Sequence, residues 1–399
     1  MTTATSTLQE RYARALMPNY GMPALALERG DGCVVWDVDG NSYLDLVGGI
    51  AVSALGHAHP AIVAAVCDQV ARLAHVSNLY LHEGQVRLAE RLLGLLGADG
   101  RVFFANSGTE ANEAALKLVR RAQGPDRPVV VAAEGGFHGR TMGSLGLTGK
   151  SSIREPFAPF GVQVRFVPYG DRAALDNAIR PDCAAMFIEP WLGEGGVVPA
   201  PPGYLHAARA ACDSTGTLLV LDEIQSGIGR TGAWFACQAA GIKPDVITLA
   251  KGLGGGLPIG ACIGMGPAGT VLAKGDHGST FGGNPVACAA ALAVLDIYKS
   301  EGLFQRGREL SPYFLDMVFS LQDVGIVTDI RGYGMFATID IQPAGAPGAR
   351  GHAFQKRLFD NGLHLKNTGD SAIIAPPLIA EKSHIDMIGD ILRKTLAQI

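Results

Sequence analysis

The chain has 399 residues, 48% of them hydrophobic and 18% charged, and it carries a formal net charge of −4. This composition is typical of a globular α/β enzyme with one large domain and a smaller one. The charge balance and the lack of a basic run argue against a nucleic-acid partner, because such proteins concentrate positive charge on one surface. No apolar stretch reaches membrane-spanning length without a charge or a glycine, so no membrane contact is expected.

The seven cysteines are widely spaced and form no C-x-x-C pair. An odd number at wide spacing argues against a disulfide framework and against a zinc site, so we expect no bound metal. The first residues, MTTATSTLQERYARALM, lack the continuous apolar segment of a secretory signal. A cytoplasmic location is therefore predicted, since the cytoplasm keeps thiols reduced.

The N-terminal part of the chain is predicted to contain a helix, a hairpin and a longer helical region. A helix is expected over residues 8–16. Residues 33–46 form two alternating runs around Asp39-Gly40, which is a hairpin turn signal. Between residues 60 and 96 the apolar positions recur at helical spacing.

Beyond residue 100, short apolar runs alternate with helical stretches. Most of these runs are apolar on both faces, which is typical of parallel strands covered by helices on both sides. From residue 285 a long helix leads into an α+β remainder. We expect a large domain over 51–285 and a smaller α+β domain built from residues 1–50 and 286–399. The strands marked by the pattern are 101–105, 129–133, 164–168, 184–189, 218–222 and 246–250.

A small polar turn lies between a strand and a helix in RVFFANSGTEANEAALKLVR. Ligands of open parallel sheets bind beyond the carboxyl ends of the strands. Ser107, Gly108 and Thr109 lie there, at the start of a helix, where N–H groups and the helix dipole can hold a phosphate. The alternative is an ordinary Ser/Thr N-cap without a ligand.

Asp222 and Lys251 each end an apolar run, in TLLVLDEIQSG and VITLAKGLGGG. Asp222 either caps the next turn or meets a cationic ring nitrogen. A lysine at a core strand's end loses hydration, which lowers its pKa and suits covalent chemistry with an aldehyde. The alternative is a lysine that reaches the surface or pairs with a carboxylate.

Several weaker patterns accompany these residues. GIGRTG at 227–232 matches a dinucleotide fingerprint, but DEIQS separates it from the strand and a poor helix start follows it. SLGLTGKSS lacks a P-loop glycine because residue 144 is serine. His57 and His59 have no third clustered ligand, so they are interpreted as loop structure. FHGR at 137–140 offers an aromatic face and a guanidinium after a strand.

Four of these features point to one cofactor. A phosphate-type helix start, a strand-end acid, a ring-sized aromatic residue and a strand-end lysine together predict pyridoxal 5′-phosphate. The protein's part is then to orient the cofactor and tune its electronics.

Longer motifs in the chain carry a family resemblance. Their order and spacing resemble the class III (ω-) aminotransferases of the fold-type I pyridoxal-phosphate enzymes, and the first three-quarters resemble the acetylornithine aminotransferases most. The resemblance implies a mostly parallel, seven-stranded sheet between helices, and a homodimer with shared active sites. The motifs are NYG at 19–21, GGIAVSALGHAHP, NSGTEANEAALK, FHGRTMGSL, EPWLGEGGV, LDEIQSGIGRTG, LAKGLGGGLPIG and HGSTFGGNP.

The resemblance assigns roles around the cofactor ring. Lys251 would bind the cofactor covalently and move a proton between substrate and cofactor. Asp222 would keep the pyridine nitrogen protonated. Gln225 would lie near the ring hydroxyl, Phe137 would stack on the ring face, and His138 counts among the cofactor-binding residues.

It also assigns roles at the phosphate. Gly108 and Thr109, with Ser107 beside them, would hold the phosphate of the same subunit. Thr280, in HGSTFGGNP, would reach the phosphate of the neighbouring subunit.

At the substrate end the chain departs from its relatives. Tyr20 and Arg140 match positions near the substrate carboxylate, and Glu194 matches a gating glutamate. Acetylornithine and ornithine aminotransferases carry a carboxylate-binding arginine where this chain has Ile373, and an aliphatic side chain cannot replace a bidentate guanidinium. The C-terminal segment is closer to pyruvate-dependent ω-amino acid and amine transaminases, which place a mobile arginine at the position of Lys366.

The implied activity is the transfer of an ω-amino group from an acetylornithine- or ornithine-type donor to a 2-oxo acid by a ping-pong mechanism. The acceptor stays open between 2-oxoglutarate and pyruvate. Glu194 is expected to pair with Lys366 or with a cationic group of the substrate. The alternatives are a β-alanine or ω-amine:pyruvate transaminase, and an aminomutase that returns the amine to its own substrate. A cofactor-binding protein without activity is disfavoured because every catalytic position is filled.

Overall fold

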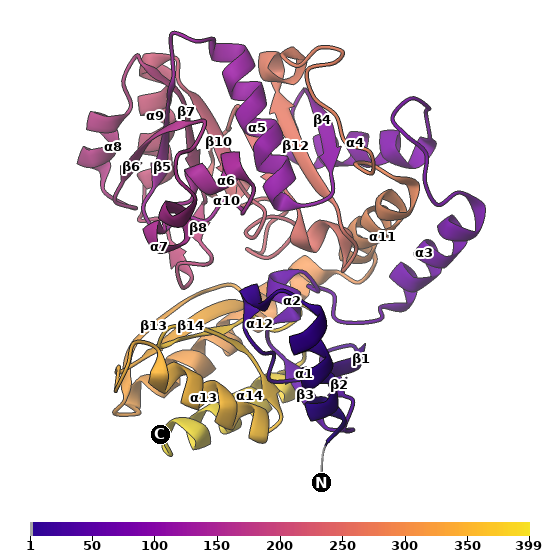
Figure 1. The fold of residues 1–399 in the computed structure, drawn as a ribbon, viewed down its shortest axis with the longest axis vertical. Coiled ribbons are helices and arrows are strands. Elements are labelled where there is room, and N and C mark those ends of the chain that lie inside the picture. Colours follow the sequence, from indigo (N-terminus) through magenta and orange to yellow (C-terminus); the bar gives the residue numbers. More distant parts are fainter. Residues whose placement is uncertain (1–2) are drawn as a thin grey trace.

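A seven-stranded sheet between helices forms the larger part of the computed structural model, which describes residues 3–399 (Figure 1). The strand order is β4-β12-β11-β10-β7-β5-β6. All neighbours run parallel except β12, which is antiparallel to both β11 and β4. The strands are β4 (Gly100–Ala105), β5 (Val129–Ala133), β6 (Gln163–Val167), β7 (Cys183–Ile188), β10 (Leu218–Asp222), β11 (Val246–Leu249) and β12 (Gly260–Met265).

The six strands expected from the sequence are present, with ends that differ by one residue at most, and β12 is the one that was not expected. Its sequence, GACIGM, has small residues in place of the β-branched run that marks a strand. The structure explains this composition, because a Cβ on Gly260 would lie 2.3 Å from the Ser107 carbonyl oxygen. A Cβ on Gly264 would lie 2.7 Å from the Ala268 backbone.

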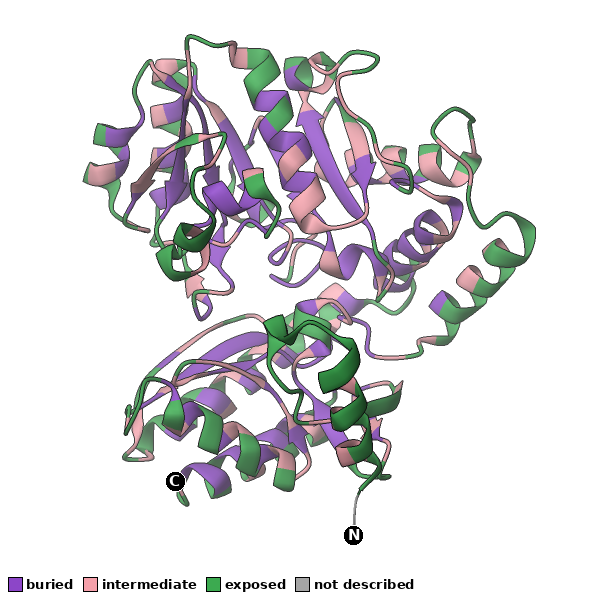
Figure 2. Cartoon of the chain, in the orientation of Figure 1, coloured by how far each residue is buried: buried purple, intermediate pink, exposed green. Residues whose placement is uncertain are grey.

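Helices cover both faces of this sheet, and its inner strands are buried along nearly all of their length, unlike the edge strands β4 and β6 (Figure 2). The helix α5 packs on β11 and β12, and α11 packs on α3 and α4. The helices are α1 (Ala4–Ala15), α2 (Gly48–Ala51), α3 (Pro60–Arg72), α4 (Glu83–Leu96), α5 (Gly108–Gln123), α6 (Met142–Leu147), α7 (Ser151–Arg154), α8 (Arg172–Ala178), α9 (Tyr204–Thr215), α10 (Ala236–Ala240), α11 (Pro285–Ser300), α12 (Leu303–Phe319), α13 (Ala349–Asp360) and α14 (Lys382–Leu396).

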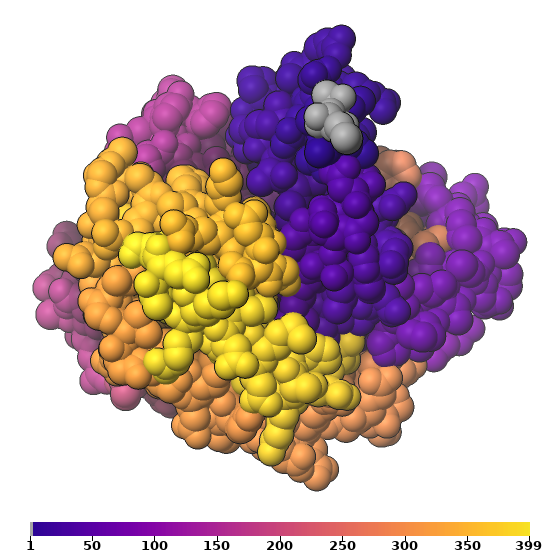
Figure 3. Space-filling model, turned by 90° about the horizontal axis from the view of Figure 1, so that it is seen from below, coloured from indigo at the N-terminus to yellow at the C-terminus, as the bar shows by residue number. Residues whose placement is uncertain are grey.

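The N- and C-terminal segments of the chain come together in the smaller part of the molecule. They share one face in the space-filling view (Figure 3). One sheet has the order β1-β2-β3-β15, in which β3 and β15 pair in parallel through Leu44 and Leu363. The other has the order β13-β14-β17-β16. The strands are β1 (Leu27–Asp31), β2 (Val34–Asp37), β3 (Ser42–Asp45), β13 (Val327–Tyr333), β14 (Phe336–Ile341), β15 (Leu363–His364), β16 (Lys366–Thr368) and β17 (Ser371–Ile374). The domain limits at residues 50 and 285 stay predictions.

The helical region expected over residues 60–96 is interrupted. Residues 73–82 leave the helix between α3 and α4 and follow the loop around Gly282. The Asn78 side chain donates to the Gly282 carbonyl at 3.0 Å and accepts from Gln85 at 2.8 Å, which ties the loop to residue 282 and to α4. This loop presents Leu79, Tyr80 and Leu81 to the solvent.

The first helix begins earlier than the expected residue 8, because the Thr3 side chain accepts the N–H of Ser6 and caps α1. Within residues 3–399 no helix is long and apolar enough to cross a bilayer.

Candidate active site

A cavity of about 430 Å³ opens at the carboxyl ends of β10 and β11 and at the start of α5. This is the edge of a parallel sheet where ligands bind. Side chains from the strand ends of the large sheet, from the α5 start and from the segment after α2 meet there. The lining includes Val52, Ser107, Gly108, Thr109, Phe137, His138, Arg140, Glu189, Glu194, Asp222, Ile224, Gln225, Lys251, Pro258 and Ile259.

Lys251 lies in a strained position at the floor of this cavity. It begins the short 3-10 helix Lys251–Gly254 with φ +44°, in the left-handed region that residues with a Cβ rarely adopt. Its pKa is lowered because burial removes water from the ammonium, although Glu194, Glu189 and Asp222 act in the opposite direction. An amine whose neutral form is favoured can act as a nucleophile and as a base.

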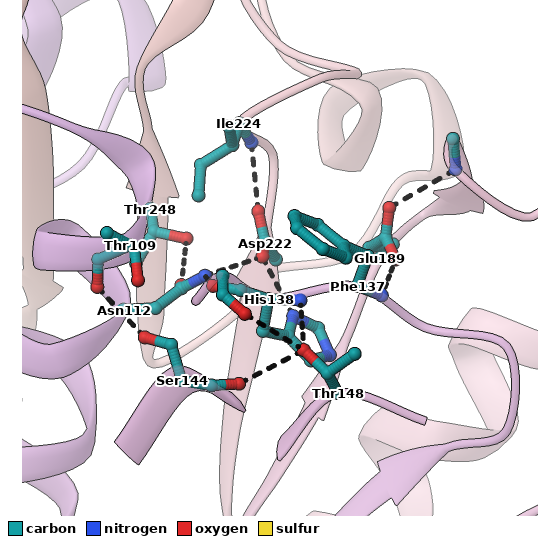
Figure 4. Close-up of polar contacts among 12 residues, drawn as sticks. Thr109, Asn112, Phe137, His138, Ser144, Thr148, Glu189, Asp222, Ile224 and Thr248 are labelled. Carbon is teal, nitrogen blue, oxygen red and sulfur yellow. Dashed lines mark hydrogen bonds and ion pairs between the residues drawn. The ribbon is translucent and has the colours of Figure 1, made fainter. Parts of the chain in front are cut away.

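Asp222 is held by three hydrogen bonds at the end of β10 (Figure 4). Its Oδ2 accepts from Asn112 Nδ2 at 2.7 Å and contacts His138 Nδ1 at 2.8 Å, and its Oδ1 accepts the N–H of Ile224 at 3.1 Å. The Asn112 amide is itself oriented by the Thr248 hydroxyl, which donates to its Oδ1 at 2.8 Å. The carboxylate is therefore fixed in one position beside the cavity.

A buried histidine and a second buried acid continue this network. Burial favours the neutral form of His138, but the hydrogen bond that its Nδ1 donates to the Asp222 carboxylate outweighs burial and raises the His138 pKa. Glu189 accepts the N–H groups of Phe137 at 2.8 Å and Gly193 at 3.2 Å, and burial raises its pKa to about 7. The ionisable side chains on this side of the cavity are therefore buried, and each of them is hydrogen-bonded.

The start of α5 forms the opposite end of the cavity. The Ser107 hydroxyl accepts the N–H of Glu110 at 3.3 Å and caps the helix. The Thr109 hydroxyl accepts the N–H groups of Arg140 and Thr141, each at 3.2 Å. The remaining first-turn N–H groups have no partner within the helix, and the helix dipole makes this end positive. The site is suited to an anion such as a phosphate.

Next to the substrate end of the cavity, an ion pair and an apolar cluster border a small void that shares Glu194 with the cavity. Lys366 Nζ lies 2.5 Å from Glu194 Oε2, and both side chains are 27% exposed. Burial opposes the ionisation of Glu194, but the charge of Lys366 outweighs it and the Glu194 pKa is lowered. Ile373 is buried in an apolar cluster with Trp191, Val197, Phe336 and Ala375.

The structure brings most of the expected site residues together; Lys366 lines only the small void next to the cavity, and two residues lie further away. Tyr20 is 88% exposed and lies beside α13, where it lines a different cavity. Thr280 is exposed in the loop before α11 and does not line the cavity either. A role for these two in a site shared between subunits stays a prediction.

Sequence reasoning missed Asn112, Thr248 and Glu189. Asn112 carried a usable signal, because it lies four residues after Gly108 and so shares its helix face. Glu189 follows β7 directly, as Asp222 ends β10. Thr248 lies inside an apolar strand, and apart from its polar side chain nothing in the sequence indicates a role at the site.

The residues present fit a ring that carries a phosphate. The α5 start supplies N–H groups for an anion, Asp222 supplies a fixed carboxylate for a cationic ring nitrogen, and Lys251 supplies an amine with a lowered pKa. Gln225 places a buried, unpartnered Oε1 in the same cavity, where a ring hydroxyl could donate to it. Phe137 supplies an aromatic face. The fold and this donor set define an enzyme that works with a phosphate-bearing, ring-type cofactor.

Comparison with known proteins identifies the family. The class III aminotransferase family matches residues 15–396. Acetylornithine aminotransferase from Streptomyces coelicolor is 56% identical over 333 residues, covering 83% of this chain and 82% of that protein. Acetylornithine aminotransferase from Mycolicibacterium smegmatis is 50% identical over 383 residues, covering 95% of both chains. The chain therefore belongs to the class III aminotransferases.

The solved structures agree in fold. Two structures of the ornithine aminotransferase from Toxoplasma gondii superpose with TM-scores of 0.94 and 0.93, at 32% and 31% identity, over 100% of this chain and 96% of theirs. One of them has pyridoxal phosphate in partial occupancy at its active site. The fold-type I architecture and the cofactor predicted from the sequence are thus confirmed, since class III aminotransferases depend on pyridoxal phosphate.

Proposed function

We propose that this chain transfers the ω-amino group of an acetylornithine- or ornithine-type donor to a 2-oxo acid by a ping-pong mechanism. The main observation behind this proposal is that Lys251 and Asp222 line one cavity at an edge of the large sheet. The chain is also 50–56% identical to acetylornithine aminotransferases. The acceptor is 2-oxoglutarate or pyruvate. We further propose a cytoplasmic location, which fits seven cysteines that are all free thiols.

Bound pyridoxal phosphate supplies an aldehyde that takes up the amine and a cationic ring that withdraws electrons from it. Asp222 holds the proton on the ring nitrogen, and Asn112 and His138 keep its carboxylate in place. Lys251 would hold the cofactor, and its amine would take up and give back the proton that the substrate carbon releases. Its lowered pKa supports the neutral form that this proton transfer requires.

The remaining assignments orient the reactants. Ser107, Gly108 and Thr109 bind the phosphate, and Phe137 covers one face of the ring and excludes water. Arg140 packs near the Phe137 ring, with its guanidinium carbon 5.7 Å from the ring centroid, and is exposed at the mouth of the cavity. It is a candidate for the substrate carboxylate together with Lys366.

A homodimer with shared sites is part of this proposal. The loop that carries Leu79, Tyr80 and Leu81 is exposed and apolar, and Phe281, next to Thr280, is exposed as well. Apolar surface of this kind is typical of a protein–protein interface. A second copy seated there would cover it and bring Thr280 to the partner's phosphate. Light scattering tests the dimer, and Thr280→Ala is expected to weaken cofactor binding without changing the dimer.

A donor–acceptor panel tests the reaction. The purified holoenzyme is given acetylornithine, ornithine, β-alanine or a simple amine, each with 2-oxoglutarate or pyruvate. We expect turnover of acetylornithine or ornithine with at least one of the two acceptors. Preference for β-alanine or simple amines with pyruvate would favour the ω-amine transaminase instead. Turnover without any oxo acid would show an aminomutase.

A further inference from the structure

A buried carboxylate outside the catalytic cavity joins three distant parts of the chain. Asp45, at the end of β3, is 2% exposed. Its Oδ2 lies 2.7 Å from His57 Nε2 and its Oδ1 lies 3.0 Å from His364 Nδ1. Oδ1 also accepts the N–H groups of Val47 at 2.9 Å and Gly48 at 3.1 Å. Four donors therefore converge on one carboxylate.

These contacts keep the carboxylate ionised. Burial alone would raise the Asp45 pKa, but the hydrogen bonds from His364 and His57 outweigh burial and hold it well below its usual value. Among residues 3–399 no group of three or more His, Cys, Asp or Glu side chains could hold a metal ion. The histidine pair and Asp45 are thus a link between chain segments, and His57, expected from the sequence to be loop structure, is one end of it.

The segment held by Asp45 is α2 (Gly48–Ala51), and its backbone is a left-handed turn. Gly48, Gly49, Ile50 and Ala51 have φ values of +50°, +62°, +67° and +60°. The turn is closed by the N–H of Val52, which donates to the Gly48 carbonyl at 2.7 Å. Left-handed backbone is strained for residues with a Cβ, and a β-branched residue such as Ile50 is rare there. Such strain persists only where the surroundings enforce it, and it concentrates at functional sites.

The strained turn forms a wall at the substrate end of the catalytic cavity. Val52 lines that cavity, and Ile50 and Ala51 line a small void together with Glu194 and Lys366. The link also reaches the lysine of the ion pair, since His364 lies two residues before Lys366. Asp45 is therefore connected to both sides of the substrate end without touching the cavity itself.

We propose that Asp45 is a positioning residue for transamination: through His57, His364 and the 47–48 backbone it fixes the left-handed turn and Lys366 against Glu194. This inference rests on the proposed function. The cofactor end of the site takes its side chains from the large sheet and from α5, and of these only Gln225 also lines the void beside the turn. Loss of the link should then impair substrate use and leave cofactor binding intact.

Asp37 offers a matched control in the same sheet. It is 4% exposed, and its carboxylate also accepts four hydrogen bonds, from the N–H of Asp39, the N–H and amide of Asn41, and the hydroxyl of Tyr43. The turn that it holds, residues 38–41, does not line the catalytic cavity. Asp37→Ala and Asp45→Ala therefore each remove a carboxylate that accepts four hydrogen bonds in the same sheet, and only Asp45 is connected to the substrate end.

The experiment compares both variants as holoenzymes, well below their melting temperatures. It follows the absorbance change of the bound cofactor on mixing with any amine that the wild-type enzyme accepts, and it measures the cofactor Kd. We expect both variants to melt earlier and to keep the cofactor Kd within about threefold. Asp45→Ala should lower kcat/KM for the amine at least tenfold, mainly through KM, whereas Asp37→Ala should stay within twofold. Equal kcat/KM values in the two variants would overturn the proposal.

Two further variants keep the test decisive if Asp45→Ala does not fold. His364→Ala removes one contact of Asp45 and retains the other, so a smaller loss of the same kind is expected. Asp45→Asn retains one acceptor oxygen for the backbone N–H groups and should recover part of the activity. Wild-type kcat/KM in both variants would also contradict the proposal. If the wild-type enzyme transaminates no amine, the proposed function fails instead, which is a distinct result.

Discussion

The cofactor end and the substrate end of the cavity are built in different ways. At the cofactor end, Asp222, Asn112, Thr248 and His138 come from neighbouring strand ends and one helix, and their hydrogen bonds leave little freedom. At the substrate end, Glu194 and Lys366 come from segments 172 residues apart, and both are partly exposed.

This difference has an energetic consequence. Removing one partner from a buried, hydrogen-bonded charge leaves the other unsatisfied, at a cost of about 3–5 kcal/mol for a buried ion pair. A partly exposed ion pair contributes only about 0–1 kcal/mol. The cofactor end is therefore hard to change without losing the enzyme, while the substrate end can be altered at little cost in stability. The following predictions test that contrast.

The largest effect is expected at Lys251. Among residues 3–399, Lys251 is the one lysine in the cavity lining, so we expect Lys251→Ala to lower activity by at least about 10³-fold, as is usual for loss of a covalent catalyst. Borohydride trapping of the cofactor on the protein should disappear, as read by mass spectrometry. Lys150→Ala, an exposed lysine in a nearby loop, is the control and should trap normally. Trapping that survives in Lys251→Ala would refute the assignment.

The next effect is expected at Asp222. Asp222→Asn keeps the side chain's shape but removes the charge that holds the ring proton and supports His138. We expect kcat to fall by about 10²-fold or more, since a lost charged contact of this kind is worth about 3 kcal/mol. The pH titration of the bound cofactor's absorbance should shift as well. Asn112→Ala should show a milder form of both changes, because it removes one donor to the same carboxylate.

The cofactor end was also the part that the sequence revealed best. Lys251, Asp222 and the α5 start lie at the ends of contiguous apolar runs, so local patterns placed them on one sheet edge. The substrate end depends on which side chains meet across the two parts of the molecule. The Lys366–Glu194 pair was one of two expectations that came from the family resemblance and not from local pattern. The partners of His57 could not be predicted, since Asp45 and His364 are 319 residues apart. The strand β12 was missed because close backbone contacts had replaced its strand-forming residues with glycine and alanine.

Glu223, next to Asp222, gives a prediction for how the unfolding free energy depends on pH. Its buried carboxylate accepts the N–H groups of Ala236 at 2.6 Å and Cys237 at 2.7 Å, yet burial raises its pKa to about 7. The folded state then holds a proton that the unfolded state has lost, so this group's stabilisation is complete below about pH 4.5 and disappears as the pH rises through 7. The change in unfolding free energy is on the order of 3 kcal/mol.

Urea unfolding between pH 4.5 and 7.5 measures that contribution. Glu223→Gln should be less stable at low pH, because it loses one acceptor, and its unfolding free energy should depend less on pH. Glu90→Gln, at an exposed position, should keep the wild-type slope. An unchanged slope in Glu223→Gln would show that the carboxylate is ionised throughout.

The smallest effects are expected at the ion pair of the substrate end, where they differ in sign. If Lys366 is the cation that receives the acceptor carboxylate, Glu194 competes with the acceptor for it at 2.5 Å. Lys366→Met should then raise the acceptor KM about tenfold, a loss of about 1.4 kcal/mol, while Glu194→Gln should lower it by freeing the lysine. Both variants should change the unfolding free energy by less than about 1 kcal/mol, because the pair is partly exposed. A rise in KM for both would mean that the intact pair, and not Lys366 alone, shapes this end of the cavity. A large loss of stability in either would remove the contrast between the two ends, since both would then depend on buried charges with fixed partners.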